Sequence, residues 1–232
     1  MGDTSLIQRD PKAVSRPRLA ITLGDPAGIG PEVVLKAIAN PGLRQAADLT
    51  LVGNAHVLES LRAQVRDWAL PMPLSADLPL LTTPEDIIEL DVTSGQPSRV
   101  TGKASFRWLE TAIAGAMAGD FDAVVTAPIA KSVWHTAGHI YPGQTEVLAE
   151  RSGAQRFGML FAAQSPRTGW LLRTLLATTH IPLNQVPTTL SPELMTRKLA
   201  LLVDCLQQDF GVETPHIAIA GLNPHSGESG KL

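Results

Sequence analysis

Two histidines stand where α/β proteins often place catalytic or metal-binding side chains. His180 ends the segment TLLATTH, and His225 follows the apolar run IAIAGLNP. Open α/β sheets bind their ligands beyond the carboxyl ends of the strands, so both imidazoles are expected at that edge of a sheet. Neutral imidazole is a common ligand of divalent metals, and one further ligand would complete a catalytic site. The residues alone leave two alternatives open, a metal pair or two ordinary polar loop histidines.

The wide separation of these two histidines in sequence excludes a local metal motif such as H-E-x-x-H. They can meet only if their strands are neighbours. We expect the other histidines to be structural or solvated, namely His56, His135, His139 and His216.

Two glycine-rich segments resemble nucleotide-binding loops but fail on spacing. In GDPAGIGPE the glycines stand at 24, 28 and 30, which is not the G-x-G-x-x-G of a dinucleotide site. This segment is either a structural strand-to-helix turn or a helix N-terminus that receives an anion. The segment HSGESGKL, residues 225–232, is compared with the P-loop pattern G-x-x-x-x-G-K-[ST]. His225 stands where the first glycine is required and Leu232 where Ser or Thr is required, so a P-loop is excluded.

The sequence gives little support to acyl transfer by a serine or cysteine nucleophile. The sequence lacks G-x-S-x-G, and its only cysteine, Cys205, is predicted on the apolar side of a helix. Lys131 follows the segment DAVVTAP and is either an anion contact or a solvated lysine.

Strand-like and helix-like segments alternate along the chain, which favours a parallel sheet covered by helices. A proline-rich stretch over 70–84 is our candidate for a crossing between sub-domains. Thr145 is expected to cap a helix that Gly153 ends. The segments 156–163 and 170–180 are expected to be adjacent antiparallel strands. We predict further strands at 18–23, 49–53, 87–92, 122–128 and 216–221, and helices at 31–39, 54–65, 103–118, 130–138, 143–153 and 191–211.

The composition of the chain argues against a nucleic-acid-binding protein and against a membrane-spanning one. The 232 residues carry 19 basic and 22 acidic side chains, so the net charge of -3 gives no footprint for nucleic acid. No apolar stretch is long enough to cross a bilayer, and one cysteine suits a reducing compartment, so the cytoplasm is expected. Residues 1–17 are polar and contain two prolines, and we expect a disordered leader there.

Five segments in order resemble the 4-hydroxythreonine-4-phosphate dehydrogenase family of pyridoxal phosphate biosynthesis. They are ITLGDPAGIGPE, DAVVTAPIAK, GQTEVLAERS, LATTHIPL and GLNPHSGE, and the resemblance runs from about residue 18 to the last residue. It implies an α/β fold of the isocitrate and isopropylmalate dehydrogenase type over 18–232, with two interleaved sub-domains, and a homodimer.

The resemblance also implies NAD or NADP as oxidant and a divalent metal (zinc, magnesium or cobalt) held by three histidines. Two of these correspond to His180 and His225. The family's third histidine lies further along, so we expect this chain to be truncated at its C-terminus and inactive by itself. No residue for catalysis or for cofactor binding is assigned.

The family contacts its substrate through a His-Thr pair in a G-H-T-E loop, which here reads Gly143-Gln144-Thr145-Glu146. We therefore expect Gln144 and Thr145 to bind substrate. Gln can donate and accept hydrogen bonds but cannot become cationic, which puts the choice of substrate in doubt.

The implied reaction oxidises 4-phosphooxy-L-threonine to a β-keto acid, which decarboxylates to 3-amino-2-oxopropyl phosphate in vitamin B6 biosynthesis. The alternatives are a related dehydrogenase of another phosphorylated hydroxy acid and an inactive truncated fragment.

Overall fold

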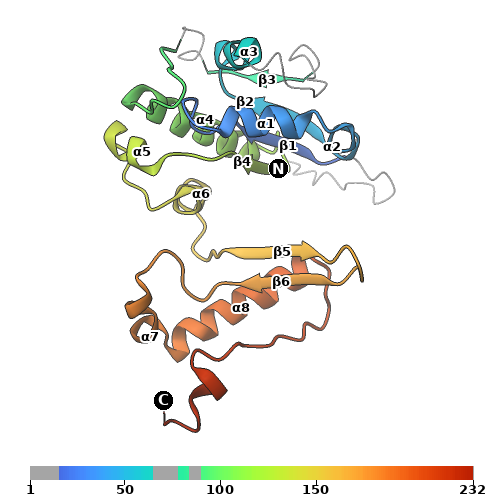
Figure 1. The fold of residues 1–232 in the computed structure, drawn as a ribbon. Coiled ribbons are helices and arrows are strands. Elements are labelled where there is room, and N and C mark those ends of the chain that lie inside the picture. The colour runs from blue at the N-terminus through green and yellow to red at the C-terminus, as the bar shows by residue number, and fades with distance from the viewer. Residues whose placement is uncertain (1–15, 65–77, 84–89, 232) are drawn as a thin grey trace, which may run out of the picture. The chain divides into compact units, whose positions relative to one another are not determined.

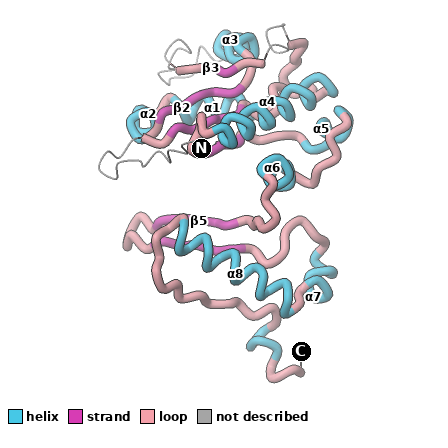
Figure 2. The backbone as a smooth tube through the Cα atoms, turned by 180° about the vertical axis from the view of Figure 1, so that it is seen from behind, coloured by secondary structure: helices cyan, strands magenta, loops and turns pink. Residues whose placement is uncertain are grey.

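The computed structural model describes residues 16–64, 78–83 and 90–231 (Figures 1 and 2). The chain divides into two compact units, Met1–Ser152 and Gly153–Leu232, which are described separately below as the first and second unit. Most of the expected leader at 1–17 and of the proline-rich stretch over 70–84 lies outside the described residues. Of the expected strand at 87–92, residues 87–89 lie outside them, and residues 90–92 are described but belong to no strand.

The first unit is built on four parallel strands in the order β3-β2-β1-β4. In register, Ala20 of β1 lies opposite Thr50 of β2 and Val124 of β4. The parallel sheet predicted from the alternating pattern is therefore confirmed. Its elements are β1 Arg18–Thr22, α1 Gly30–Ile38, α2 Pro41–Ala46, β2 Asp48–Val52, α3 Ala55–Gln64, β3 Leu80–Leu81, α4 Arg99–Ala118, β4 Ala123–Thr126, α5 Lys131–Ala137 and α6 Gln144–Ser152.

Helices cover both faces of this sheet. Comparison of the two opposite views places α1 on one face and α4 on the other (Figures 1 and 2). Leu35 and Ile38 of α1 and Trp108 of α4 are buried in one cluster with Leu51 of β2. Each helix thus buries one apolar stripe on the sheet, as expected for an α/β layer.

The ends of these helices follow local side-chain chemistry. Ser98 caps α4 by accepting a hydrogen bond from the Thr101 amide, and the Thr101 hydroxyl accepts one from the Ser98 amide. Gly119 ends α4 in the left-handed conformation. The predicted helix at 103–118 is therefore confirmed, but it begins four residues earlier than its periodicity indicated.

Two local predictions in the first unit are wrong. The three-to-four spacing of Phe106, Leu109, Ile113 and Met117 predicts one buried stripe on this helix, but Met117 is 60% exposed, because it lies in the last turn of α4 before Gly119. Thr145 was expected to cap its helix, yet α6 already begins at Gln144. Thr145 therefore lies inside the first turn of α6.

The second unit consists of a hairpin followed by a long helix. Strands β5 and β6 pair antiparallel, with Phe161 opposite Thr174, as the sequence predicted. Ser191 caps α8 by accepting from the Leu194 amide. The elements are β5 Leu160–Gln164, β6 Leu171–Leu175, the 3-10 helix η3 Leu183–Gln185, α7 Val186–Thr189, α8 Pro192–Gln208 and the 3-10 helix η4 Pro224–Gly227.

The prediction of a strand at 216–221 is wrong, since the structure assigns no strand to these described residues. The segment instead lines a groove of about 760 Å³ with β6 and α8. Leu206 is the only apolar side chain of the described second unit that is buried, whereas Trp170 is 63% exposed. Among the described residues, no helix combines the length and apolarity that crossing a lipid bilayer requires.

Candidate functional site

The loop after β1 is held against the loop after β4. The buried Asp25 donates its backbone N–H to the Pro128 carbonyl at 3.0 Å, and its Oδ1 accepts from the Ala27 amide at 3.0 Å. β2 lies on one side of β1 and β4 on the other, so the two loops flank the point where the strand order reverses. This edge is where open α/β sheets bind ligands.

The glycines of GDPAGIG make that close approach sterically possible. A Cβ added to Gly24 would lie 2.2 Å from the Pro128 carbonyl oxygen, and one added to Gly30 would lie 2.3 Å from the Leu23 carbonyl oxygen. Gly24 also has a φ of +70°. The structure therefore supports the structural reading of this segment over the anion-binding one.

Three elements meet beside Ala127 in the loop after β4. Gln144, the first residue of α6, donates from Nε2 to the Ala127 carbonyl at 3.4 Å, and Lys131 begins α5. A Cβ added to Gly143 would lie 3.4 Å from Glu146 Oε2 and 3.7 Å from Lys131 Nζ. Gln144, Glu146 and the exposed Lys131 therefore surround Gly143.

Two oxygen atoms in this cluster have unmet hydrogen-bonding capacity. Gln144 Oε1 and Glu146 Oε2 are buried and have no hydrogen-bond partner among the described residues. Thr145 is half-buried, and its hydroxyl makes no hydrogen bond within the described part of the chain. Buried acceptors are normally satisfied, so such a pair marks a place where a donor is missing.

The two candidate metal ligands lie in the second unit, and both are exposed. His180 follows the end of β6 by five residues rather than directly, and its φ is +55°. His225 lies in η4 with a φ of +49°, and the strand expected before it is absent from the described residues. Its Nδ1 lies 2.9 Å from Glu228 Oε1.

Within the described residues no contact joins His180 to His225, and no cluster of three or more His, Cys, Asp or Glu side chains is suited to a metal. A carboxylate only accepts hydrogen bonds, so a neutral imidazole at His225 would donate from Nδ1 to Glu228 and leave the lone pair of Nε2 free. Imidazole nitrogen suits zinc and cobalt well. The donor chemistry of the two histidines therefore fits a divalent metal, although their convergence remains a prediction.

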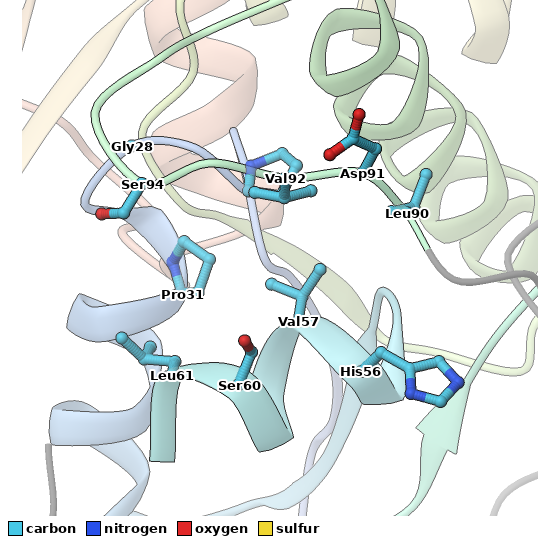
Figure 3. Close-up of a pocket in the computed structure, with 11 residues that line it drawn as sticks. Gly28, Pro31, His56, Val57, Ser60, Leu61, Leu90, Asp91, Val92 and Ser94 are labelled. Carbon is cyan, nitrogen blue, oxygen red and sulfur yellow. The ribbon is translucent and has the colours of Figure 1, made fainter. Parts of the chain in front are cut away.

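A pocket that the sequence did not predict lies elsewhere in the first unit (Figure 3). It has a volume of about 450 Å³ and is walled by α3, the start of α1 and residues 90–94. Figure 3 shows Ser60 and Val57 of α3 facing Val92 across it. None of the predicted site residues lines this pocket.

Comparison with known proteins gives a consistent family. Residues 43–232 match the model of the family described as "Pyridoxal phosphate biosynthetic protein PdxA". A curated relative from Synechocystis, named 4-hydroxythreonine-4-phosphate dehydrogenase, is 57% identical over 220 residues, which cover 94% of this chain and 63% of the relative. A Nostoc relative of the same name is 53% identical over 94% of this chain and 61% of its own length.

Solved structures with similar folds carry the same family name or a related dehydrogenase name. A Klebsiella pneumoniae 4-hydroxythreonine-4-phosphate dehydrogenase matches with a TM-score of 0.76 and 30% identity, over 93% of this chain and 66% of that one. A terephthalate 1,2-cis-dihydrodiol dehydrogenase from Burkholderia xenovorans matches with a TM-score of 0.54 and 27% identity, over 94% and 65%. The chain spans less than two thirds of the length of these relatives. With a family model that matches residues 43–232, this chain belongs to the PdxA family of pyridoxal phosphate biosynthetic proteins.

Proposed function

We propose that this chain forms part of an NAD-dependent, divalent-metal-dependent dehydrogenase that oxidises 4-phosphooxy-L-threonine to a β-keto acid. That acid then decarboxylates to 3-amino-2-oxopropyl phosphate in vitamin B6 biosynthesis. The observation that carries this proposal is the 57% identity, over 94% of the chain, to a relative named 4-hydroxythreonine-4-phosphate dehydrogenase.

The wider context of the protein is proposed on the same basis. We expect a two-domain fold of the isocitrate and isopropylmalate dehydrogenase type, a homodimer and a cytoplasmic location. The ligand is a small phosphorylated molecule rather than nucleic acid, in keeping with a net charge of -3.

In the first unit, Gln144 and Thr145 would contact the substrate at the carboxyl end of β4. The Gln144 amide is fixed by the Ala127 carbonyl, which leaves Oε1 pointing elsewhere as an acceptor. Lys131 Nζ lies 3.7 Å from the position of a Cβ added to Gly143 and would neutralise an acidic group of the ligand. These residues would orient the substrate by hydrogen bonds and charge.

In the second unit, His180 and His225 would hold the divalent metal. Glu228 would keep the proton of His225 on Nδ1, so that Nε2 is the ligating atom. When bound, a divalent cation would supply Lewis-acid stabilisation of negative charge on the reacting oxygen.

No residue is assigned to the NAD or NADP site. The glycines at 24 and 30 are used to pack loop against loop, so they do not form a cradle for a dinucleotide pyrophosphate.

A related dehydrogenase of another phosphorylated hydroxy acid is the second candidate. The observation that favours it is Gln144, which replaces the histidine of the family's loop and cannot carry charge. The likeness to a structure described as a dihydrodiol dehydrogenase also indicates that this architecture accommodates other alcohols.

A substrate screen distinguishes the two candidate functions. Reduction of NAD would be followed with 4-phosphooxy-L-threonine and with phosphorylated threonate, in the presence of zinc, cobalt or magnesium. Faster turnover of the amino acid supports the first candidate, and preference for the acid without an amino group supports the second.

A further inference from the structure

We propose that residues 216–221 pair with the open edge of β6 when His180 and His225 bind one divalent cation, so that metal binding closes the groove of the second unit. This inference rests on the metal site proposed above. It adds the conformational change by which the two histidines come together.

The first partner in this change is the free edge of β6, which within the described residues pairs with β5 alone. The Leu176 N–H donates to the Met159 carbonyl of the same hairpin at 3.0 Å. Because antiparallel pairs alternate, the backbone groups of Leu171, Arg173 and Leu175 point away from β5. No backbone hydrogen bond within the described chain reaches these outward groups. Such an edge is a template for a further strand.

The second partner is the apolar segment 216–221. Its sequence HIAIAG places Ile217 and Ile219 two residues apart, so both side chains lie on one face of an extended chain. Ile219 is 61% exposed. In the part of the chain that the structure describes, no backbone hydrogen bond involves residues 216–221. The segment therefore combines the branched apolar residues of a strand with unpaired backbone groups.

Both partners line the same groove, to which Leu199 and Leu202 of α8 contribute apolar side chains. Figure 1 shows that β6 and the segment after α8 run in the same direction, opposite to α8. A strand, a helix and a second strand joined in this order typically pair as parallel neighbours. Closure thus adds one parallel strand to the hairpin and buries Ile217 and Ile219 against α8, which is favourable because apolar surface leaves water.

The two histidines follow these partners at the same end. His180 lies five residues beyond β6, and His225 lies four residues beyond the segment 216–221. Parallel pairing therefore brings both imidazoles to the carboxyl edge of the extended sheet. A cation that binds both imidazoles has a higher affinity for the paired form than for the open one. By linkage, the cation shifts the population toward the paired form.

Hydrogen–deuterium exchange of the full chain, measured by mass spectrometry with and without Zn²⁺, tests this coupling. Zinc should slow amide exchange in the peptide that contains 217–221 by about tenfold or more, because pairing with β6 protects its N–H groups. His225→Ala removes one ligand and should abolish this protection. His56→Ala, a change at an exposed histidine of the first unit, is the matched control and should keep it.

A second pair of variants tests the pairing itself. Ile219→Asp keeps both histidines but places a charge on the face that closure buries, so it should lose the protection and bind zinc more weakly. Leu183→Asp, at an 86% exposed position that does not line the groove, should retain both properties. Circular dichroism without zinc checks that both variants fold as the wild type does.

The possible outcomes separate this inference from the proposed function. Zinc that binds without slowing exchange at 217–221, or protection that survives in His225→Ala, would overturn the coupling and leave the proposed dehydrogenase standing. Failure of zinc to bind would overturn the coupling together with the metal site. If zinc produces the protection but no NAD is reduced in the substrate screen, the proposed function fails while the coupling stands.

Discussion

Nδ1 of His225 lies 2.9 Å from Oε1 of Glu228, in a short segment where both residues have a positive φ. This backbone is uncommon for residues other than glycine and brings the carboxylate back onto the imidazole. A carboxylate behind a metal-ligating histidine fixes its tautomer and raises its basicity. Glu228 would therefore position His225 at the proposed metal site.

The first prediction concerns this pair. Glu228→Gln should weaken binding of Co²⁺ to the purified chain by about 10- to 100-fold, measured from the visible absorption of the bound ion. Glu213→Gln, a change at another exposed glutamate of the second unit, should leave the affinity unchanged. Equal affinities in all three proteins would remove Glu228 from the site.

The second prediction concerns His139, which stacks on Phe106 with ring centroids 3.6 Å apart. Burial lowers the pKa of His139, with Glu110 opposing this and Lys103 and Arg151 adding to it. The unfolded chain then binds the proton more readily, so the contribution of His139 to stability is present above about pH 6.5 and is lost as pH falls below that value.

Denaturant unfolding at several pH values between about 5 and 8 measures this effect. His139→Gln should flatten the pH dependence of the free energy of unfolding, whereas His56→Gln, at an exposed position, should not. An unchanged pH profile in His139→Gln would show that the stacked imidazole is not the titrating group.

The third prediction concerns a buried hydrogen bond of the first unit. Trp134 Nε1 donates to Ser105 Oγ at 2.8 Å, and both residues are buried. Ser105→Ala leaves a buried N–H without an acceptor and should lower the free energy of unfolding by about 1–3 kcal/mol. Ser132→Ala, at an exposed position, is the control, and comparable losses in both variants would contradict this explanation.

The fourth prediction compares two glycines. At one, only the backbone conformation disfavours a side chain, and at the other a Cβ would also clash with neighbouring atoms. Gly24 and Gly119 both have positive φ, but only at Gly24 would a Cβ meet other atoms. Gly119→Ala should cost about 1–2 kcal/mol from conformation alone. Gly24→Ala should cost more, because it forces the Pro128 carbonyl away, and thermal unfolding of the two variants compares them. Equal losses would mean that the two loops are not held together as described.

Patterns confined to one segment were predictable from the sequence. Pro31 marked the start of α1, and the spacing of Phe106, Leu109 and Ile113 marked the buried stripe of α4, because both depend on neighbours within one or two turns. The antiparallel hairpin of β5 and β6 was also predictable, because turn residues join two apolar runs.

Features that depend on distant partners were not predictable. The segment 216–221 is apolar enough for a strand. A strand also needs a neighbouring strand to pair with, and the composition of the segment does not show whether one is present. Met117 continues the apolar spacing of its helix but lies where that helix is no longer covered. The burial of Glu146 Oε2 and the stacking of His139 on Phe106 depend on contacts between elements that no local pattern encodes.

The proposed activity is tested most directly by oxidation of 4-phosphooxy-L-threonine. NADH formation and release of carbon dioxide would be followed with this chain, alone and joined to the remainder of its Synechocystis relative, in the presence of a divalent metal. We predict that the joined protein forms NADH and carbon dioxide in equal amounts and that His225→Ala abolishes both. A folded, metal-loaded joined protein that binds the substrate but forms no NADH would contradict the proposed function.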